Sequence, residues 1–191
     1  ESLGAKFVEL PLETGDAQDK GGYAKAMDEA FYRKQRETMA RVVAESGVPV
    51  VLMHMRGTPA TMQQNICYAG LIQELTAFFC ERLAAAAAAG IAEDTIIIDP
   101  GIGFGKSVDT DNFLILQRLH EFAAFGRPVL IGPSRKAFIG RATGRDAAQR
   151  DAGTAAAVAL AVYNGAHIVR VHNAAMMRDV ARVAAAIKKA R

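Results

Sequence analysis

The segment Thr95–Ser107, TIIIDPGIGFGKS, constrains the fold of this chain more than any other. Its first four residues, Thr95–Ile98, are all β-branched, which is typical of a strand buried on both faces of a parallel sheet. The strand ends at the carboxylate of Asp99, and Pro100 and three closely spaced glycines follow. Ligands of α/β proteins bind in the loops after the carboxyl ends of strands. Asp99 above this loop is therefore a candidate binding residue.

The same order of strand and helix recurs along the chain. We predict strands at Ala5–Leu10, Val48–Met55, Thr95–Ile98, Arg127–Pro133 and Ala166–His172. We predict helices at Tyr23–Glu45, Leu71–Ala89, Asp111–Phe122 (with Asp109 or Thr110 as N-cap), Gly153–Asn164 and Ala174–Lys189. Repeated βα units with parallel strands indicate an α/β fold. The units could form a partial TIM (βα)₈ barrel or an open Rossmann-like sheet of five parallel strands. A complete barrel takes about 250 residues, and without a visible linker we expect a single α/β domain over residues 1–191.

Composition limits the classes of partner. The net charge of +3 is small and dispersed, so it gives no reason to expect nucleic acid. We see no signal peptide and no apolar run long enough to cross a membrane. Cys67 and Cys80 lack metal-ligand spacing and are expected to be reduced thiols of a cytoplasmic protein.

Polar residues gather where the predicted strands end. They are His54 and Arg56, Asp99, Ser134 with Arg135 and Lys136, and Arg170 with His172. In a parallel sheet these ends share one edge, where a carboxylate can bind the N–H groups of a heterocycle and the cations a phosphate-like group. Plainer interpretations are open for three kinds of residue. Arg56 and Arg135 could be solvated charges, His54 a core histidine, and Asp99 a turn cap.

Two familiar fingerprints do not fit. Gly105–Ser107 ends like a phosphate-binding P-loop, but Pro100 stands where that motif requires glycine. The glycines of residues 101–105 do not match the dinucleotide-binding pattern either. No zinc-type cluster and no Ser-His-acid set is evident, so we predict no metal ligands.

Four segments together resemble the dihydropteroate synthase family. They are VVLMHMRGTPATMQ (Val50–Gln63), IIIDPGIGFGKS (Ile96–Ser107), VLIGPSRKAFIG (Val129–Gly140) and GTAAAVALAVYNGAHIVRVHN (Gly153–Asn173). The resemblance runs from about Met39 to Arg191 and implies strands five to eight of a TIM barrel. It also implies a transferase of folate biosynthesis. That enzyme condenses 6-hydroxymethyl-7,8-dihydropterin diphosphate with 4-aminobenzoate, with magnesium, and releases diphosphate.

The resemblance assigns roles residue by residue. The substrate-binding positions are Met53, Asp99, Phe104, Gly132 and Ser134. The catalytic positions are Lys136, Arg170 and His172. Asp99 would bind the pterin, Lys136 would contact the pterin and border the aminobenzoate side, and Arg170 with His172 would hold the diphosphate. Mg²⁺ is implied by the family, but we find no counterpart here of its first strands or of the Asn that serves the metal.

The first 37 residues resemble a different family. ESLGAKFVEL and GGYAKAM are similar to a segment of alanine dehydrogenase and transhydrogenase α subunits. We therefore predict a chimera-like chain, with a Rossmann-type βα unit over residues 1–38 and a half barrel over 39–191. A half barrel exposes strand edges, so we expect a homodimer. Two functions remain open: the synthase reaction, or a catalytically inactive scaffold with residual pterin or anion binding.

Overall fold

A computed structural model describes residues 29–190. The described residues form two compact units, one of residues 29–50 and 84–95, the other of residues 51–83 and 96–190. The predicted strand Ala5–Leu10, and the part of the predicted helix Tyr23–Glu45 that precedes residue 29, lie outside the described residues.

In the first unit, helix α1 (Glu29–Ser46) ends at a glycine, as the sequence predicts. Gly47 has φ of +63° and its N–H donates to the carbonyl oxygen of Val43 at 3.0 Å. Only glycine adopts this left-handed conformation without strain, so it ends the helix. Helix α2 (Leu71–Ala88), of which residues 71–83 belong to the second unit, also stops before a glycine with positive φ, Gly90, one residue earlier than predicted. A short 3₁₀ helix, η1 (Glu93–Thr95), follows.

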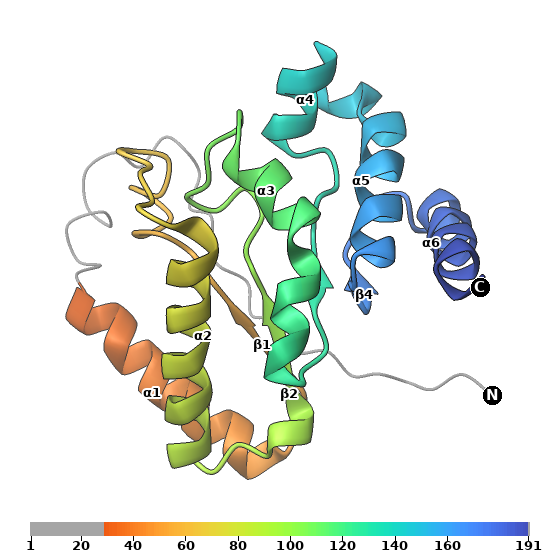
Figure 1. Cartoon of the computed structure of the whole chain (residues 1–191). Helices are drawn as coiled ribbons and strands as arrows, with labels where there is room; N and C mark the ends of the chain where they lie inside the picture. The colour runs from red at the N-terminus through yellow and green to blue at the C-terminus, as the bar shows by residue number, and fades with distance from the viewer. Residues whose placement is uncertain (1–28, 191) are drawn as a thin grey trace. The chain divides into compact units, whose positions relative to one another are not determined.

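The strands of the second unit are short. They are β1 (Val50–Met53), β2 (Ile96–Asp99), β3 (Leu130–Ile131) and β4 (Ile168–Val169). β1 pairs with β2, β3 pairs in parallel with β4, and a parallel bridge between Ile98 and Val129 joins the two pairs (Figure 1). The strands therefore neighbour one another in chain order, and helices alternate with them, which is an α/β arrangement. Pro128 and Pro133 have no N–H to donate, which explains why β3 is shorter than the predicted Arg127–Pro133.

The other helices of the second unit are α3 (Asp111–Gln117), η2 (Leu119–Phe125), α4 (Ala137–Thr143), η3 (Ala147–Gln149), α5 (Asp151–Tyr163) and α6 (Ala174–Lys189). They agree with the sequence prediction except that one predicted helix divides, α4 and η3 were not predicted, and α5 begins two residues earlier than predicted. The predicted helix Asp111–Phe122 divides at Arg118 into an α-helix and a 3₁₀ helix. Thr110 holds its N-cap position without a side-chain cap bond. Helix α4 was missed because its seven residues are too few to show periodicity.

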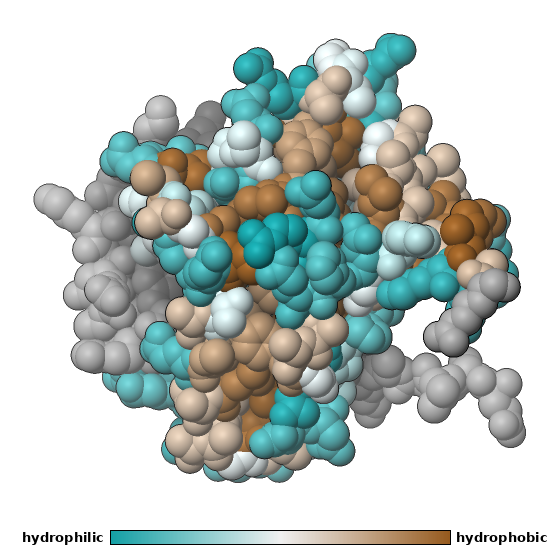
Figure 2. Space-filling model, viewed as in Figure 1, coloured by the Kyte–Doolittle hydropathy of each residue, from teal (hydrophilic) through white to brown (hydrophobic). Residues whose placement is uncertain are grey.

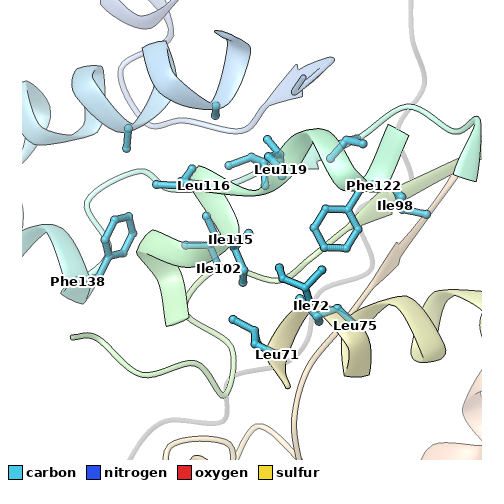
Figure 3. Close-up of a cluster of buried hydrophobic side chains, with 14 of the residues drawn as sticks. Leu71, Ile72, Leu75, Ile98, Ile102, Ile115, Leu116, Leu119, Phe122 and Phe138 are labelled. Carbon is cyan, nitrogen blue, oxygen red and sulfur yellow. The ribbon is translucent and has the colours of Figure 1, made fainter. Parts of the chain in front are cut away.

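The core of this unit lies around β2 and the loop that follows it. Figure 3 shows apolar side chains from α2, β2, α3, η2 and α4 converging there. The labelled members are Leu71, Ile72, Leu75, Ile98, Ile102, Ile115, Leu116, Leu119, Phe122 and Phe138. Burying each such side chain contributes about 1.5–3 kcal/mol. Ile98 and Ile102 stand on both sides of Asp99, so the core fixes the backbone from which this carboxylate projects.

Candidate active site

Asp99 is buried at the end of β2. It is 1% exposed. Its Oδ1 accepts the N–H of Gly101 at 2.8 Å, and its Oδ2 lies 3.5 Å from Nη2 of Arg170. Burial raises the pKa of Asp99, and the Gly101 bond and the nearby cations Arg170, Lys106 and Lys136 oppose that rise. The turn-cap interpretation of Asp99 therefore holds for one oxygen only, because the second faces the guanidinium.

Lys136 lies across the loop that follows β2. Its Nζ is 4.1 Å from the centroid of the Phe104 ring, a cation–π contact. Gly103 has φ of +81°, and a Cβ there would lie 3.1 Å from Cδ of Lys136. Desolvation, and then the charge of Arg170, lower the pKa of Lys136. The loop thus provides both the ring and the open backbone on which this lysine rests.

Arg170, from the end of β4, reaches over Gly132 at the end of β3. A Cβ at Gly132 would lie 3.2 Å from Nη2 of Arg170. The arginine side chain is 52% exposed although its partner Asp99 is buried. Its guanidinium therefore presents donors to the solvent side while one nitrogen faces the carboxylate.

His172 is held by Ser134. The Ser134 hydroxyl lies 2.8 Å from Nδ1 of His172, and the His172 N–H donates to the same oxygen at 3.1 Å. The hydroxyl can accept the backbone N–H and at the same time donate its own proton to Nδ1. In that arrangement neutral His172 carries its ring proton on Nε2, which is then a donor on the exposed side.

Arg135 is not a solvated charge. It has φ of +57°, which is uncommon for a residue with a side chain. Its guanidinium pairs with Asp151 at 2.8 and 3.2 Å, and its N–H donates to Oγ1 of Thr154 at 3.0 Å. Hydrogen bonds from Arg135 and Asn173 lower the pKa of Asp151 to about 2. Arg135 thereby ties the turn between Ser134 and Lys136 to the start of α5.

Arg56 and His54 also have internal partners. Arg56 pairs with Glu74 at 2.9 Å and lies 4.4 Å above the Tyr68 ring. His54 is buried, and its ring meets Phe78 edge-on with centroids 4.8 Å apart. The core-histidine interpretation of His54 is therefore the one that the geometry favours. Met53, the last residue of β1, directly precedes His54 and is half-buried.

Lys106 was missed as a site residue from the sequence. Its side chain is fully buried, and its Nζ lies 2.8 Å from Nδ1 of His54, 3.0 Å from the carbonyl oxygen of Phe104 and 3.2 Å from that of Gly101. The available signal was its place directly after the glycine loop, which sequence reasoning used only to reject a P-loop. That rejection agrees with the geometry, because the N–H groups of Gly101 and Gly103 donate to Asp99 and Asn112.

A protein-family profile described as "Pterin binding enzyme" matches residues 23–172. The chain belongs to the family of pterin-binding enzymes. The match begins sixteen residues before Met39, inside the segment that we compared with alanine dehydrogenases, and it gives no support to that comparison or to a chimera.

Known members of this pterin-binding family resemble the chain at about 40% identity. Dihydropteroate synthase of Escherichia coli (strain K12) is 40% identical over 148 residues, which is 78% of this chain and 52% of that protein. The solved Yersinia pestis dihydropteroate synthase, in a sulfonamide drug complex, has a TM-score of 0.77 at 35% identity and covers 79% of this chain and 55% of its own. Xanthomonas albilineans dihydropteroate synthase with 4-aminobenzoic acid has a TM-score of 0.72 at 42% identity, covering 80% and 54%. The chain spans about half the length of these relatives.

The Mg²⁺ that the family resemblance implies has no cluster of protein ligands among the described residues. Over residues 29–190, no three side chains of His, Cys, Asp or Glu lie close enough together to hold a metal ion. The oxygens of Asp99 face an N–H group and a guanidinium instead. In the same part of the chain, no helix is long and apolar enough to span a membrane.

Proposed function

We propose that this chain acts as a dihydropteroate synthase. The observation that carries the proposal is the buried Asp99 carboxylate, bordered by Lys136 and Arg170 at the carboxyl ends of neighbouring strands. The family membership and the 4-aminobenzoic acid in the Xanthomonas structure support the same reaction.

Asp99 is suited to bind the pterin. A carboxylate accepts hydrogen bonds from the amino group and the ring N–H of a pterin in bidentate fashion. One oxygen already accepts the Gly101 N–H, which orients the group, and the 3.5 Å distance from Oδ2 to Arg170 leaves that oxygen able to accept more. Phe104 and Met53 would provide apolar contacts, and Gly132 would leave room beside the ring.

Arg170 and His172 are suited to hold the diphosphate. In the reaction the nitrogen of 4-aminobenzoate attacks the pterin methylene carbon, and the bond from that carbon to the diphosphate oxygen breaks. The nitrogen then loses a proton, and the bonding electrons leave with diphosphate. Negative charge therefore develops on the leaving group, where the Arg170 guanidinium and Nε2–H of His172 would stabilise it.

Lys136, next to Ser134, would contact the pterin on the aminobenzoate side. The family implies Mg²⁺, whose chemistry would be to neutralise the diphosphate.

The architecture within this proposal is a partial (βα)₈ barrel in one α/β domain. Its support is the neighbour order β1, β2, β3, β4, which matches successive barrel strands. An open Rossmann-like sheet is the alternative. A cytoplasmic location and a composite origin of residues 1–38 remain predictions.

A homodimer is part of the proposal as well. Helices α5 and α6 lie side by side, and Figure 2 shows hydrophobic surface over both. Leu160, Tyr163, Val183 and Ile187 line a groove there, and each is more than half exposed. A second copy of the chain would cover these side chains.

The second candidate is binding of pterin or anion without turnover. Binding alone needs only the Asp99 carboxylate and the donors of Arg170 and His172, which the described residues provide.

Calorimetric titration with a pterin diphosphate analogue, at fixed magnesium, tests both candidates. We expect the wild type to bind and Asp99→Asn to lose binding, while Asp94→Asn, an exposed aspartate of η1, binds like the wild type. Turnover of the diphosphate with 4-aminobenzoate then distinguishes the synthase from the binding-only candidate. A folded wild-type protein that does not bind the analogue would contradict both.

A further inference from the structure

Lys106 is the one fully buried cation in the second unit's described residues, and the proposed reaction does not use it. Its exposed fraction is 0%. Burying an ammonium group costs free energy unless its donors are satisfied. Here Nζ has hydrogen-bonding partners on two loops. In the loop after β1 they are the ring of His54 and, at 3.4 Å, its carbonyl oxygen. In the loop after β2 they are the carbonyl oxygens of Gly101 and Phe104.

Charged groups around Lys106 partly offset the cost of burying its ammonium group. Burial lowers its pKa to about 7, Asp99 and Asp111 act to raise it, and Arg56 acts to lower it further. His54 is the direct ring partner, and burial followed by the charge of Lys106 lowers the pKa of His54 to about 3. His54 is therefore neutral at physiological pH, and when Lys106 is protonated Nδ1 of His54 accepts a hydrogen bond from Nζ.

The glycine loop is shaped around this ammonium group. Gly101, Gly103 and Gly105 all have positive φ, which turns the carbonyl groups of Gly101 and Phe104 toward Nζ. Any Cβ at Gly101 would overlap the carbonyl oxygen of His54, so the two loops are in direct backbone contact. The same loop carries Phe104, whose ring supports Lys136, and its Gly101 N–H orients Asp99.

We propose that Lys106 is a positioning residue: by joining the loop after β1 to the glycine loop 101–105, it fixes the Asp99 carboxylate and the Phe104 ring for pterin binding. The inference rests on the proposed function for its ligand, but the geometry of the loop can be tested without that ligand. It predicts that loss of Lys106 weakens binding of the pterin but not of diphosphate. The hydrogen bonds of Nζ go to His54, Gly101 and Phe104, and none of them goes to Arg170 or His172.

The first test compares two ligands on one variant. We expect Lys106→Met to raise the Kd of 6-hydroxymethylpterin about tenfold or more, as for loss of a charge-assisted hydrogen-bond network, and the Kd of inorganic diphosphate less than about twofold. Lys34→Met, the same change at an exposed position of α1, controls for lost charge. Equal weakening of both ligands, or unchanged pterin affinity, overturns the proposal.

Two further measurements separate this inference from the proposed function. If the wild type binds no pterin, the proposed function fails, and amide hydrogen exchange still decides on the loop. Faster exchange at Gly101 and Gly103 in Lys106→Met, with residues 129–136 unchanged, supports the positioning role, whereas equal exchange overturns it.

If Lys106→Met does not fold, nitrogen NMR of His54 in the wild type gives the answer. At about pH 6, below the lowered pKa of Lys106, an Nε2–H tautomer of His54 supports the contact, because Nδ1 is then free to accept a hydrogen bond from Nζ. An Nδ1–H tautomer at that pH overturns it.

Discussion

The two halves of the candidate site are built differently. On the pterin side, Asp99 and Lys106 are buried and bonded to backbone groups of one loop. On the anion side, Arg170 is half exposed and His172 is exposed, and each contacts one side chain at the end of another strand, Asp99 for Arg170 and Ser134 for His172. A flat heterocycle gains from a fixed partner, whereas a diphosphate that must leave gains from exposed donors that water can replace.

The largest expected effect is the loss of diphosphate affinity when Arg170 is replaced. We expect Arg170→Met to raise the Kd of diphosphate about 30-fold, because a charge-assisted bidentate contact is lost, and that of the pterin less. In the wild type, rising salt should weaken diphosphate binding much more than pterin binding. Titration at low and high salt measures both effects, and Arg145→Met, at an exposed loop position, is the control. Equal salt dependence for the two ligands would remove the contrast.

The pH dependence of pterin affinity tests the role of the buried Asp99 carboxylate. The pKa of Asp99 is raised above its ordinary 3.8, so the carboxylate takes up a proton at a higher pH than an exposed aspartate would. Pterin affinity should therefore be present at neutral pH and fall as the pH drops through that raised pKa, by about tenfold per unit below it. Measuring the pterin Kd of the wild type from about pH 4 to pH 7 checks this, and an affinity that stays constant over that range would contradict it. Because Asp99→Asn is expected to lose binding, any pterin affinity that the variant retains should not fall in acid.

Removing the Ser134 hydroxyl tests how much the orientation of His172 contributes to diphosphate binding. We expect Ser134→Ala to raise the Kd of diphosphate only about threefold, since His172 loses its orientation but keeps its donors. Pterin affinity should stay the same within error. A loss as large as that of Arg170→Met would mean that the hydroxyl itself contacts the ligand.

The smallest expected effect on binding belongs to Asp151→Asn. Asp151 holds Arg135 and Asn173 but contacts neither proposed ligand, so affinities should change less than about twofold. Its pKa is lowered to about 2, so the ion pair stabilises the fold above the ordinary 3.8 and is lost as the pH falls toward 2. Thermal unfolding should show the variant a few degrees less stable at neutral pH. The gap should close under acid conditions, and a gap that persists there would contradict the assignment.

The sequence predicted the part of the site that depends on where strands end. β2 was expected to stop at Asp99 and does, because a run of β-branched residues gives way to a carboxylate and a proline. Lys106 could not be assigned in the same way, because its role depends on a histidine fifty-two residues earlier and on carbonyl directions set by glycine backbone angles. Arg135 was left open between solvent and ligand since its partner, Asp151, begins a helix that was predicted to start two residues later.

Gly101 limits how this site can be redesigned. Because any side chain at this position would overlap the His54 carbonyl, residue 101 must stay glycine in a library that varies the candidate site. Diversity aimed at new heterocycles therefore belongs at Met53 and Phe104, the two side chains proposed to make apolar contacts with the pterin. Such a library would change these side chains and keep the backbone of the glycine loop.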